Sequence, residues 1–150
     1  MDQLPDPTSR KSGPKVVVVG PCASGKSTLV RNLHKKGIDA FVAGQEHSAI
    51  RNLWAKRDPD IIVALDLDLE TLRKRRGESW PSSLYRVQHE RLSDAFAAAT
   101  TIIDTSRVPE EVVAARVIEI VTNFQPDAPN SRETSLLDTE PESRPLRPGS

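Results

Sequence analysis

The sequence predicts an α/β fold, a three-layer αβα sandwich around a mostly parallel sheet of about four strands. Two observations support this prediction. Short apolar runs rich in β-branched residues alternate along the chain with longer stretches of helical periodicity. The first run is four consecutive valines, 16–19, which suits a central parallel strand covered on both faces. Such alternation implies right-handed βαβ crossovers with helices on both faces of the sheet.

The predicted strands are bounded by turn residues, and the sequence between them is helical or polar. The first strand is Lys15–Gly20, and two lysines and Gly37 end the helix predicted over Lys26–Lys36. The remaining strands are predicted over Ile38–Ala43, Ile61–Leu65 and Thr100–Ile103.

Four further helices are predicted from apolar spacing and from their end residues. They cover about Ser48 to Lys56, a short basic segment Leu69–Arg76, the stretch Leu84–Ala99, and a last helix from near Pro109 to Phe124. Proline suits the first position of that last helix, and the two glutamates behind it suit its positive end. Residues 15–124 are therefore expected to form one domain.

Both ends of the chain differ in composition from this domain. Residues 1–14 are polar and proline-bearing, and we expect a flexible leader. Residues 125–150 contain five prolines and almost no apolar residues, so a disordered tail is expected.

Composition limits the classes of function. The 150 residues include 21 basic and 21 acidic ones, so no overall charge favours nucleic acid or an anionic membrane. No apolar run approaches the roughly 20 residues that span a bilayer, and no secretory signal is visible. Cys22 is the only cysteine, which excludes an internal disulfide and a cysteine-based metal cage. We expect a cytoplasmic protein with no membrane partner and no direct nucleic-acid signal.

The most specific motif lies between the first strand and the first helix. It is Gly20-Pro21-Cys22-Ala23-Ser24-Gly25-Lys26-Ser27, followed by Thr28. A strand, G-x-x-x-x-G-K-[ST] and a helix in this order indicate a P-loop, whose backbone N–H groups surround phosphate oxygens. Lys26 would reach the β- and γ-phosphates, and the Ser27 hydroxyl would coordinate Mg²⁺. The alternative, a chance glycine-rich turn, does not explain the flanking strand and helix.

With two further stretches, this motif resembles the P-loop kinases of nucleotides and small metabolites. Residues 61–76 are similar to the strand, turn and basic helix that lead into the lid of those kinases. Residues 102–112 are similar to their strand and loop near the adenine and the final helix. The resemblance implies ATP and Mg²⁺ as ligands, and it implies arginines that close over the phosphates, with Arg73, Arg75 and Arg76 as candidates. The alternative for these arginines is a solvated helix face.

The carboxylate on the metal side has two candidates. Asp66 ends an apolar strand and matches the loose pattern of a Walker B aspartate. The kinase resemblance instead makes 38–43 the metal-side strand, whose end would bring Gln45 and Glu46 to the γ-phosphate. Glu46 would then bind metal-held water or act as a base, and Gln45 would orient a water. An ordinary polar loop is the alternative, and His47 is interpreted as a helix-start residue.

The same loop carries a second resemblance, and the region before it departs from the kinase pattern. Residues 43–46 (AGQE) are similar to the switch II region of small GTPases. However, Phe41 stands where those proteins have an aspartate, and no N-K-x-D motif reads guanine. The segment that binds the acceptor in nucleotide kinases is missing or is reduced to residues 44–60, because strand 38–43 follows the first helix directly.

The sequence therefore favours an ATP–Mg²⁺-binding P-loop NTPase with a kinase-like core. It would transfer the γ-phosphoryl group to an unidentified small acceptor or hydrolyse ATP. The alternatives are a nucleotide-dependent switch read by a protein partner, and a domain that binds nucleotide without catalysis. The predicted site comprises Lys26, Glu46, Gln45, Arg73 and Arg76 for catalysis, and Ser27, Glu46 and Asp66 for the metal.

Overall fold

The computed structural model describes residues 13–125, and these residues form one parallel four-stranded sheet between helices. The strands are β1 (Lys15–Val19), β2 (Asp39–Val42), β3 (Ile61–Asp66) and β4 (Thr101–Asp104). Their order across the sheet is β2-β1-β3-β4, and each neighbouring pair is parallel. The predicted α/β fold is confirmed. The predictions for residues 1–12 and 126–150, leader and tail, lie outside the described part of the chain.

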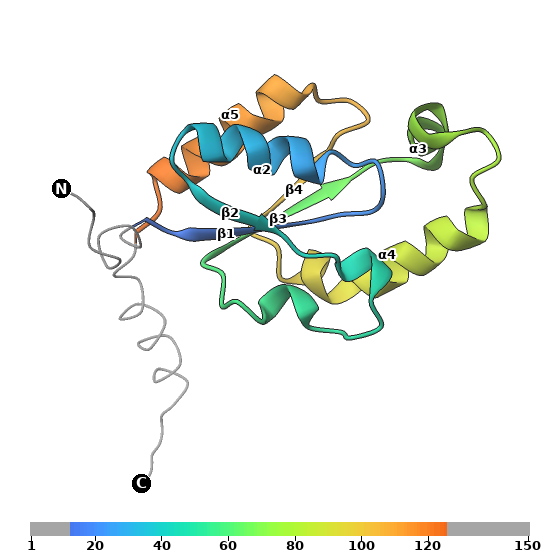
Figure 1. Ribbon diagram of the computed structural model, residues 1–150, viewed down its shortest axis with the longest axis horizontal. Coiled ribbons are helices and arrows are strands. Elements are labelled where there is room, and N and C mark those ends of the chain that lie inside the picture. Colours follow the sequence, from blue (N-terminus) through green and yellow to red (C-terminus); the bar gives the residue numbers. More distant parts are fainter. Residues whose placement is uncertain (1–12, 126–150) are drawn as a thin grey trace, which may run out of the picture.

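Two layers of helix cover the sheet, one on each face (Figure 1). On one face, α2 (Lys26–Lys35) and α5 (Glu110–Thr122) pack side by side. On the other face, α4 (Ser82–Ala97) lies beside the segment that follows β2. The short helix α3 (Leu69–Arg76) stands at the end of the sheet where the strands finish. No described helix has the length and apolarity needed to cross a membrane.

The valine run forms the centre of two cores, because successive side chains of a strand point to opposite faces. Val16 and Val18 pack against α2 and α5, whereas Val17 and Val19 face α4. All four valines have no exposed surface. Burial on both faces explains why this strand needs four apolar residues in succession instead of an alternating pattern.

The helix ends follow the local chemistry of the sequence. Helix α2 stops where Gly37 takes a φ of 76°, and the Gly37 and Ile38 N–H groups donate to the last carbonyls of the helix. Helix α3 begins at Asp68, whose carboxylate accepts a 2.7 Å hydrogen bond from the N–H of Thr71, and it ends at Gly77. These boundaries agree with the predicted ones to within a residue.

The helix predicted over residues 48–56 is absent, which corrects that prediction. This segment contains only one 3₁₀ turn, η2 (Leu53–Ala55), and another 3₁₀ turn, η1 (Gln45–His47), precedes it. Side chains form hydrogen bonds with backbone groups that a helix would pair with each other. Ser48 Oγ accepts from the Ile50 N–H, and the Gln45 amide donates to the Ile50 carbonyl. Ile50 in this segment is 52% exposed.

The topology places the carboxyl end of β1 at a crevice. The connection from β1 to β2 runs over one face of the sheet, and the later connections run in the opposite direction over the other face. In open α/β sheets, ligands bind outside the carboxyl ends of the strands at such a switch point. Residues 20–27 lie there.

Candidate functional site

The backbone of the 20–27 loop leaves amide groups unpaired at the start of α2. Ala23 and Gly25 both adopt positive φ, 66° and 100°, which curls the chain around one point. Neither residue's N–H has a hydrogen-bond acceptor within residues 13–125, and α2 has no side-chain cap. Because the first N–H groups of a helix also lack partners, this end of α2 offers several donors and a positive dipole end to an anion.

Gly20 fixes the loop tightly against β3. A Cβ atom at this position would lie 2.5 Å from the Leu65 carbonyl oxygen and 2.6 Å from Ser24 Oγ. Ser24 is fully buried beneath the loop, and its hydroxyl has no hydrogen-bond partner among the described residues. The first glycine of the motif is therefore required for close approach of the two backbones.

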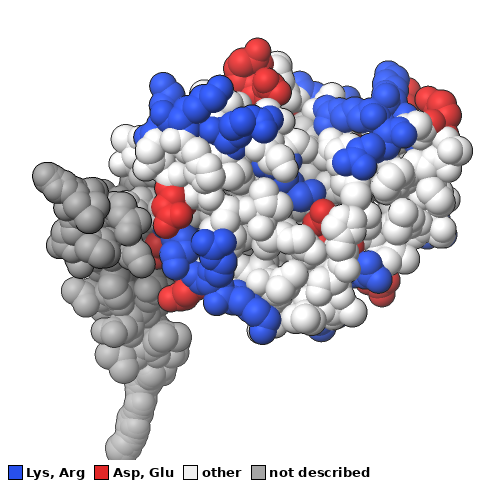
Figure 2. All heavy atoms as spheres, in the orientation of Figure 1, with Lys and Arg blue, Asp and Glu red and all other residues white. Residues whose placement is uncertain are grey.

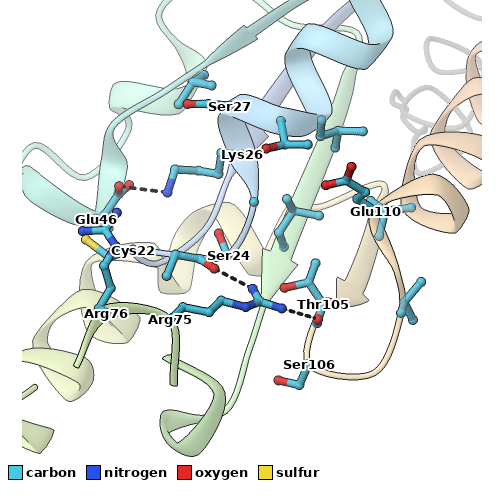
Figure 3. Close-up of a pocket in the computed structure, with 18 of the residues that line it drawn as sticks. Cys22, Ser24, Lys26, Ser27, Glu46, Arg75, Arg76, Thr105, Ser106 and Glu110 are labelled. Carbon is cyan, nitrogen blue, oxygen red and sulfur yellow. Dashed lines mark hydrogen bonds and ion pairs between the residues drawn. The ribbon is translucent and has the colours of Figure 1, made fainter. Parts of the chain in front are cut away.

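Lys26 is turned back toward its own loop and toward Glu46. Its Nζ donates to the carbonyls of Gly20 and Pro21 at 2.9 and 3.0 Å, and it lies 3.0 Å from Glu46 Oε2. The side chains of this ion pair are 10% and 4% exposed. The end of β2, rather than the end of β3, therefore delivers the carboxylate that meets the loop lysine, as Figure 3 shows.

The Glu46 carboxylate has one engaged oxygen and one free oxygen. Oε2 contacts Lys26 and lies 3.3 Å from His47 Nε2, whereas Oε1 is buried without a hydrogen-bond partner in the described part of the chain. Arg91 donates to the Glu46 carbonyl at 3.2 Å and so holds the backbone of η1. A buried polar atom without a partner is costly, which makes this oxygen a candidate for contact with a bound group.

These residues line a cavity of about 990 Å³ at the carboxyl edge of the sheet. The 22–29 stretch forms one wall, η1 a second, the end of α3 a third, and the loop before α5 a fourth. Ser27 and Thr28 lie along the first wall, and Thr105 to Glu110 lie along the last. A volume of this size lies at the upper end of the range for small-molecule and cofactor sites.

Two of the three candidate arginines on α3 reach the cavity. Arg75 donates to the Ala23 carbonyl at 2.6 Å and to the Thr105 carbonyl at 2.9 Å, so its guanidinium joins opposite walls. Arg76 also lines the cavity. Arg73 does not, because its Nε donates to the Trp80 carbonyl and holds the turn between α3 and α4. In Figure 2, the basic side chains at the α3 end form one of several separate basic groups on the face shown.

The structure does not bring Gln45 to the cavity. This side chain is fully buried, its Nε2 donates to the Ile50 carbonyl, and its Oε1 accepts from the Trp54 N–H. Both polar groups are thereby used to hold the loop that follows η1. Gln45 thus connects η1 to η2, and the water-orienting role expected from the sequence has no geometric support.

Asp66 is not among the cavity-lining residues, although its carbonyl accepts hydrogen bonds from Thr105, which is one of them. Its Oδ1 accepts from the Leu67 N–H and lies 2.8 Å from His89 Nε2. The hydrogen bond to this carboxylate raises the pKa of His89, against the opposing effect of partial burial. The Tyr85 ring packs against the His89 ring at an interplanar angle of 46°, and burial raises the pKa of the tyrosine hydroxyl. Asp66 thus belongs to a side-chain cluster between β3 and α4.

Gln88 is a site residue that sequence analysis missed. Its Oε1 accepts from the Cys22 N–H at 3.0 Å, and its Nε2 donates to Cys22 Sγ at 3.2 Å. The side chain is 1% exposed, so α4 fixes both the backbone and the thiol of the loop. The two residues are 66 positions apart, and glutamine within a helix carries no local signal that predicts such a contact.

No family model matches this chain, and no curated protein matches it in sequence. The function must therefore be inferred from the loop, the cavity and the charged groups around it.

Proposed function

We propose that this protein is a P-loop NTPase that binds ATP with Mg²⁺ and has a kinase-like core. The observation that carries the proposal is the placement of Lys26 beside unpaired loop amides at the head of a large cavity. The Lys26 cation, the N–H donors of the loop and the positive end of the α2 dipole converge there, and this is the combination that binds nucleotide phosphates. The motif of residues 20–27 supports the same assignment independently of the geometry.

The residues present fit the phosphates and the metal ion. The loop amides from Ala23 onward would donate to phosphate oxygens, and Lys26 would leave Glu46 to contact the β- and γ-phosphates. Ser27 lines the cavity and carries a hydroxyl that suits Mg²⁺. The unpaired Oε1 of Glu46 is an acceptor for a metal-held water. A bound Mg²⁺ would supply neutralisation of the phosphate charge.

Arg75 and Arg76 would complete the charge around the transferring group. Arg75 now binds two backbone carbonyls, which are weaker partners than a phosphate because they are neutral. An exchange of these carbonyls for phosphate oxygens would close α3 over the cavity. Catalysis of phosphoryl transfer consists of such positioning and electrostatic stabilisation, with little covalent chemistry by the protein.

We infer transfer of the γ-phosphoryl group to a small acceptor, or to water. Only residues 36–38 separate α2 from β2, so the chain lacks the inserted segment that binds the acceptor in nucleotide kinases. An acceptor would therefore occupy the cavity beside η1 or arrive on a partner.

A nucleotide-dependent switch is the second candidate, and one specific observation favours it. Withdrawal of Lys26 from Glu46 would leave a buried carboxylate unpaired beside η1. Gln45, the adjacent residue, holds Ile50 and Trp54, so a movement of η1 would spread to residues 48–56. A domain that binds nucleotide without any reaction remains the third alternative.

The decisive experiment measures Mg²⁺-dependent binding and turnover of ATP and GTP, with and without a panel of small hydroxyl acceptors. We expect ATP binding in the wild type and none in Lys26→Ala, because the loop loses its cation. Circular dichroism should show the same fold in both proteins. Equal ATP affinity in the two proteins would refute the proposal.

Two paired variants test which carboxylate acts with the metal ion. Glu46→Gln should lower turnover by about 10²-fold or more if this residue holds a metal-bound water or acts as a base. Asp66→Asn is the matched control and should retain turnover. A loss confined to Asp66→Asn would assign the metal side to β3.

The switch is tested by protease protection. The protection of residues 44–60 and 73–83 should be measured once in the presence of ADP and once in the presence of a non-hydrolysable ATP analogue. A nucleotide-dependent difference in 44–60 is the outcome expected of a switch.

A further inference from the structure

Three side chains that can serve as metal ligands meet at the corner of the cavity where the 20–27 loop contacts η1. Cys22 Sγ, a Glu46 carboxylate oxygen and a His47 ring nitrogen all lie within 4.8 Å of one another. We propose that these three side chains bind a divalent cation of the Zn²⁺ class. This site shares Glu46 with the Mg²⁺ site of the proposed function but adds the sulfur and nitrogen ligands of Cys22 and His47, and its test does not require nucleotide.

The spacing of the ligand atoms fits tetrahedral coordination. With Zn–S of about 2.3 Å and Zn–N and Zn–O near 2.0–2.1 Å, tetrahedral angles place S and N about 3.6 Å apart and N and O about 3.3 Å apart. In the structure, Cys22 Sγ lies 3.8 Å from His47 Nε2, and His47 Nε2 lies 3.3 Å from Glu46 Oε2. An ion can therefore be accommodated with only small side-chain movements.

The free oxygen of Glu46 is an independent indication of a missing ligand. The residue is 3% exposed, and its Oε1 has no hydrogen-bond partner among residues 13–125. A cation that binds both oxygens of the carboxylate would satisfy Oε1, which protein groups leave unpaired, in addition to Oε2. All three side chains line the cavity, so the fourth position of the ion would be open to water.

Gln88 gives the site an outer contact of the kind that orients metal ligands. Its amide donates to Cys22 Sγ and accepts from the Cys22 N–H, so the sulfur is held in place before any ion binds. Such second contacts fix ligand orientation and stabilise the charged ligand form. On coordination, Cys22 releases its thiol proton to water and binds as thiolate.

The donor set separates this ion from Mg²⁺. Sulfur and imidazole nitrogen are ligands for Zn²⁺ and related transition ions, whereas Mg²⁺ prefers oxygen and keeps several waters. The cations Lys26 and Arg76 line the same cavity and oppose a divalent ion. Lys26 in addition contacts Glu46 Oε2, one of the proposed ligand atoms. Removal of the lysine should therefore strengthen metal binding, although it should abolish nucleotide binding.

The test uses the full chain without an affinity tag, titrated with Co²⁺ as a spectroscopic probe and then with Zn²⁺ in competition. We expect a thiolate-to-cobalt charge-transfer band that Zn²⁺ removes and excess Mg²⁺ does not. Cys22→Ser should abolish the band, and His47→Gln should weaken Zn²⁺ binding at least about tenfold. His34→Gln is the matched control, because His34 binds the Ala40 carbonyl and should leave the titration unchanged.

The outcomes separate this proposal from the nucleotide site. Lys26→Ala should bind Zn²⁺ more tightly than the wild type. No charge-transfer band in the wild type, or equal Zn²⁺ affinity in the wild type, Cys22→Ser and His47→Gln, would overturn the metal site. Weaker Zn²⁺ binding in Lys26→Ala would overturn the competition for Glu46. None of these measurements depends on whether ATP binds.

Discussion

Gly20 is the residue at which the 20–27 loop comes closest to the neighbouring strand. The space that its missing side chain leaves is occupied by the Leu65 carbonyl and by Ser24 Oγ. The serine hydroxyl can rotate, but the carbonyl belongs to the backbone of a central strand and cannot move alone. The position of this one residue therefore determines where the whole loop lies.

We predict that Gly20→Ala destabilises the protein by about 1–3 kcal/mol, because the new methyl group overpacks the contact with β3. Urea unfolding followed by circular dichroism measures this difference. Gly44→Ala is the control, because a Cβ atom there meets no atom within 4 Å. Equal unfolding midpoints for both variants would contradict the close approach.

His89 and Asp66 form a partly exposed pair whose strength depends on protonation of the histidine. The hydrogen bond to Asp66 raises the folded-state pKa of His89 above its ordinary value of 6.5. Stability from this pair is therefore fully present below that value and is lost as the pH rises through the folded-state pKa.

We predict that His89→Gln lowers the free energy of unfolding by about 0.5 kcal/mol near pH 6 and by less near pH 9, since partial exposure weakens such pairs. Denaturant titrations of both proteins at the two pH values measure the difference. A cost of His89→Gln that is larger at high pH would contradict the assigned direction of the shift.

At the scale of the elements, the segment from η1 to η2 depends on side chains more than on its own backbone. Gln45 is fully buried, and its two hydrogen bonds tie residues 50 and 54 to the turn that carries Glu46. Arg51 extends this attachment to α4 through two hydrogen bonds with Asp94. Side-chain hydrogen bonds thus hold this segment in place, and it contains no regular helix.

We predict that Gln45→Ala destabilises the protein by about 1–3 kcal/mol, because it leaves the Ile50 carbonyl and the Trp54 N–H without their partners. Hydrogen exchange should become faster in residues 48–56, and mass spectrometry of peptides would detect this. Gln125→Ala, at an exposed position, should change neither quantity. Unaltered exchange in Gln45→Ala would show that the glutamine does not hold the segment.

Elements with strong local signals could be predicted from the sequence, and those fixed by distant contacts could not. The valine run, the glycine that ends α2 and the basic helix α3 agree with the structure because each depends on nearby residues. The helix expected over 48–56 failed because Gln45 and Ser48 satisfy the backbone in another way. The Cys22–Gln88 contact was not foreseeable, since it requires α4 to cross beneath the loop.

At the scale of the molecule, the cavity is assembled from segments that only the fold brings together. The 20–27 loop, η1, the end of α3 and the loop before α5 each lie in the segment that follows one of the four strands. The kinase resemblance indicated the strand that Glu46 follows, although the residues alone left Asp66 as an alternative. It did not separate Arg73 from its neighbours, since the turn at Trp80 decides which arginine faces the cavity.

We predict that ATP with Mg²⁺ stabilises the whole domain, because a ligand that binds only the folded state shifts the unfolding equilibrium. At about 100 times the dissociation constant, the gain is about 2.7 kcal/mol. Differential scanning calorimetry should show the corresponding rise in melting temperature. Lys26→Ala, with the same nucleotide, should show none. A rise of equal size in both proteins would place the ligand elsewhere.

The ion pair between Lys26 and Glu46 supplies the loop lysine with an anion from within the protein. Under the proposed function, entry of a phosphate would then exchange one anion for another at the lysine. The internal pair compensates a largely buried ammonium group, and its strength would be subtracted from the affinity for the phosphate. The same exchange would release the Glu46 carboxylate beside the incoming anion, so that phosphate binding and the freeing of Glu46 would be one event.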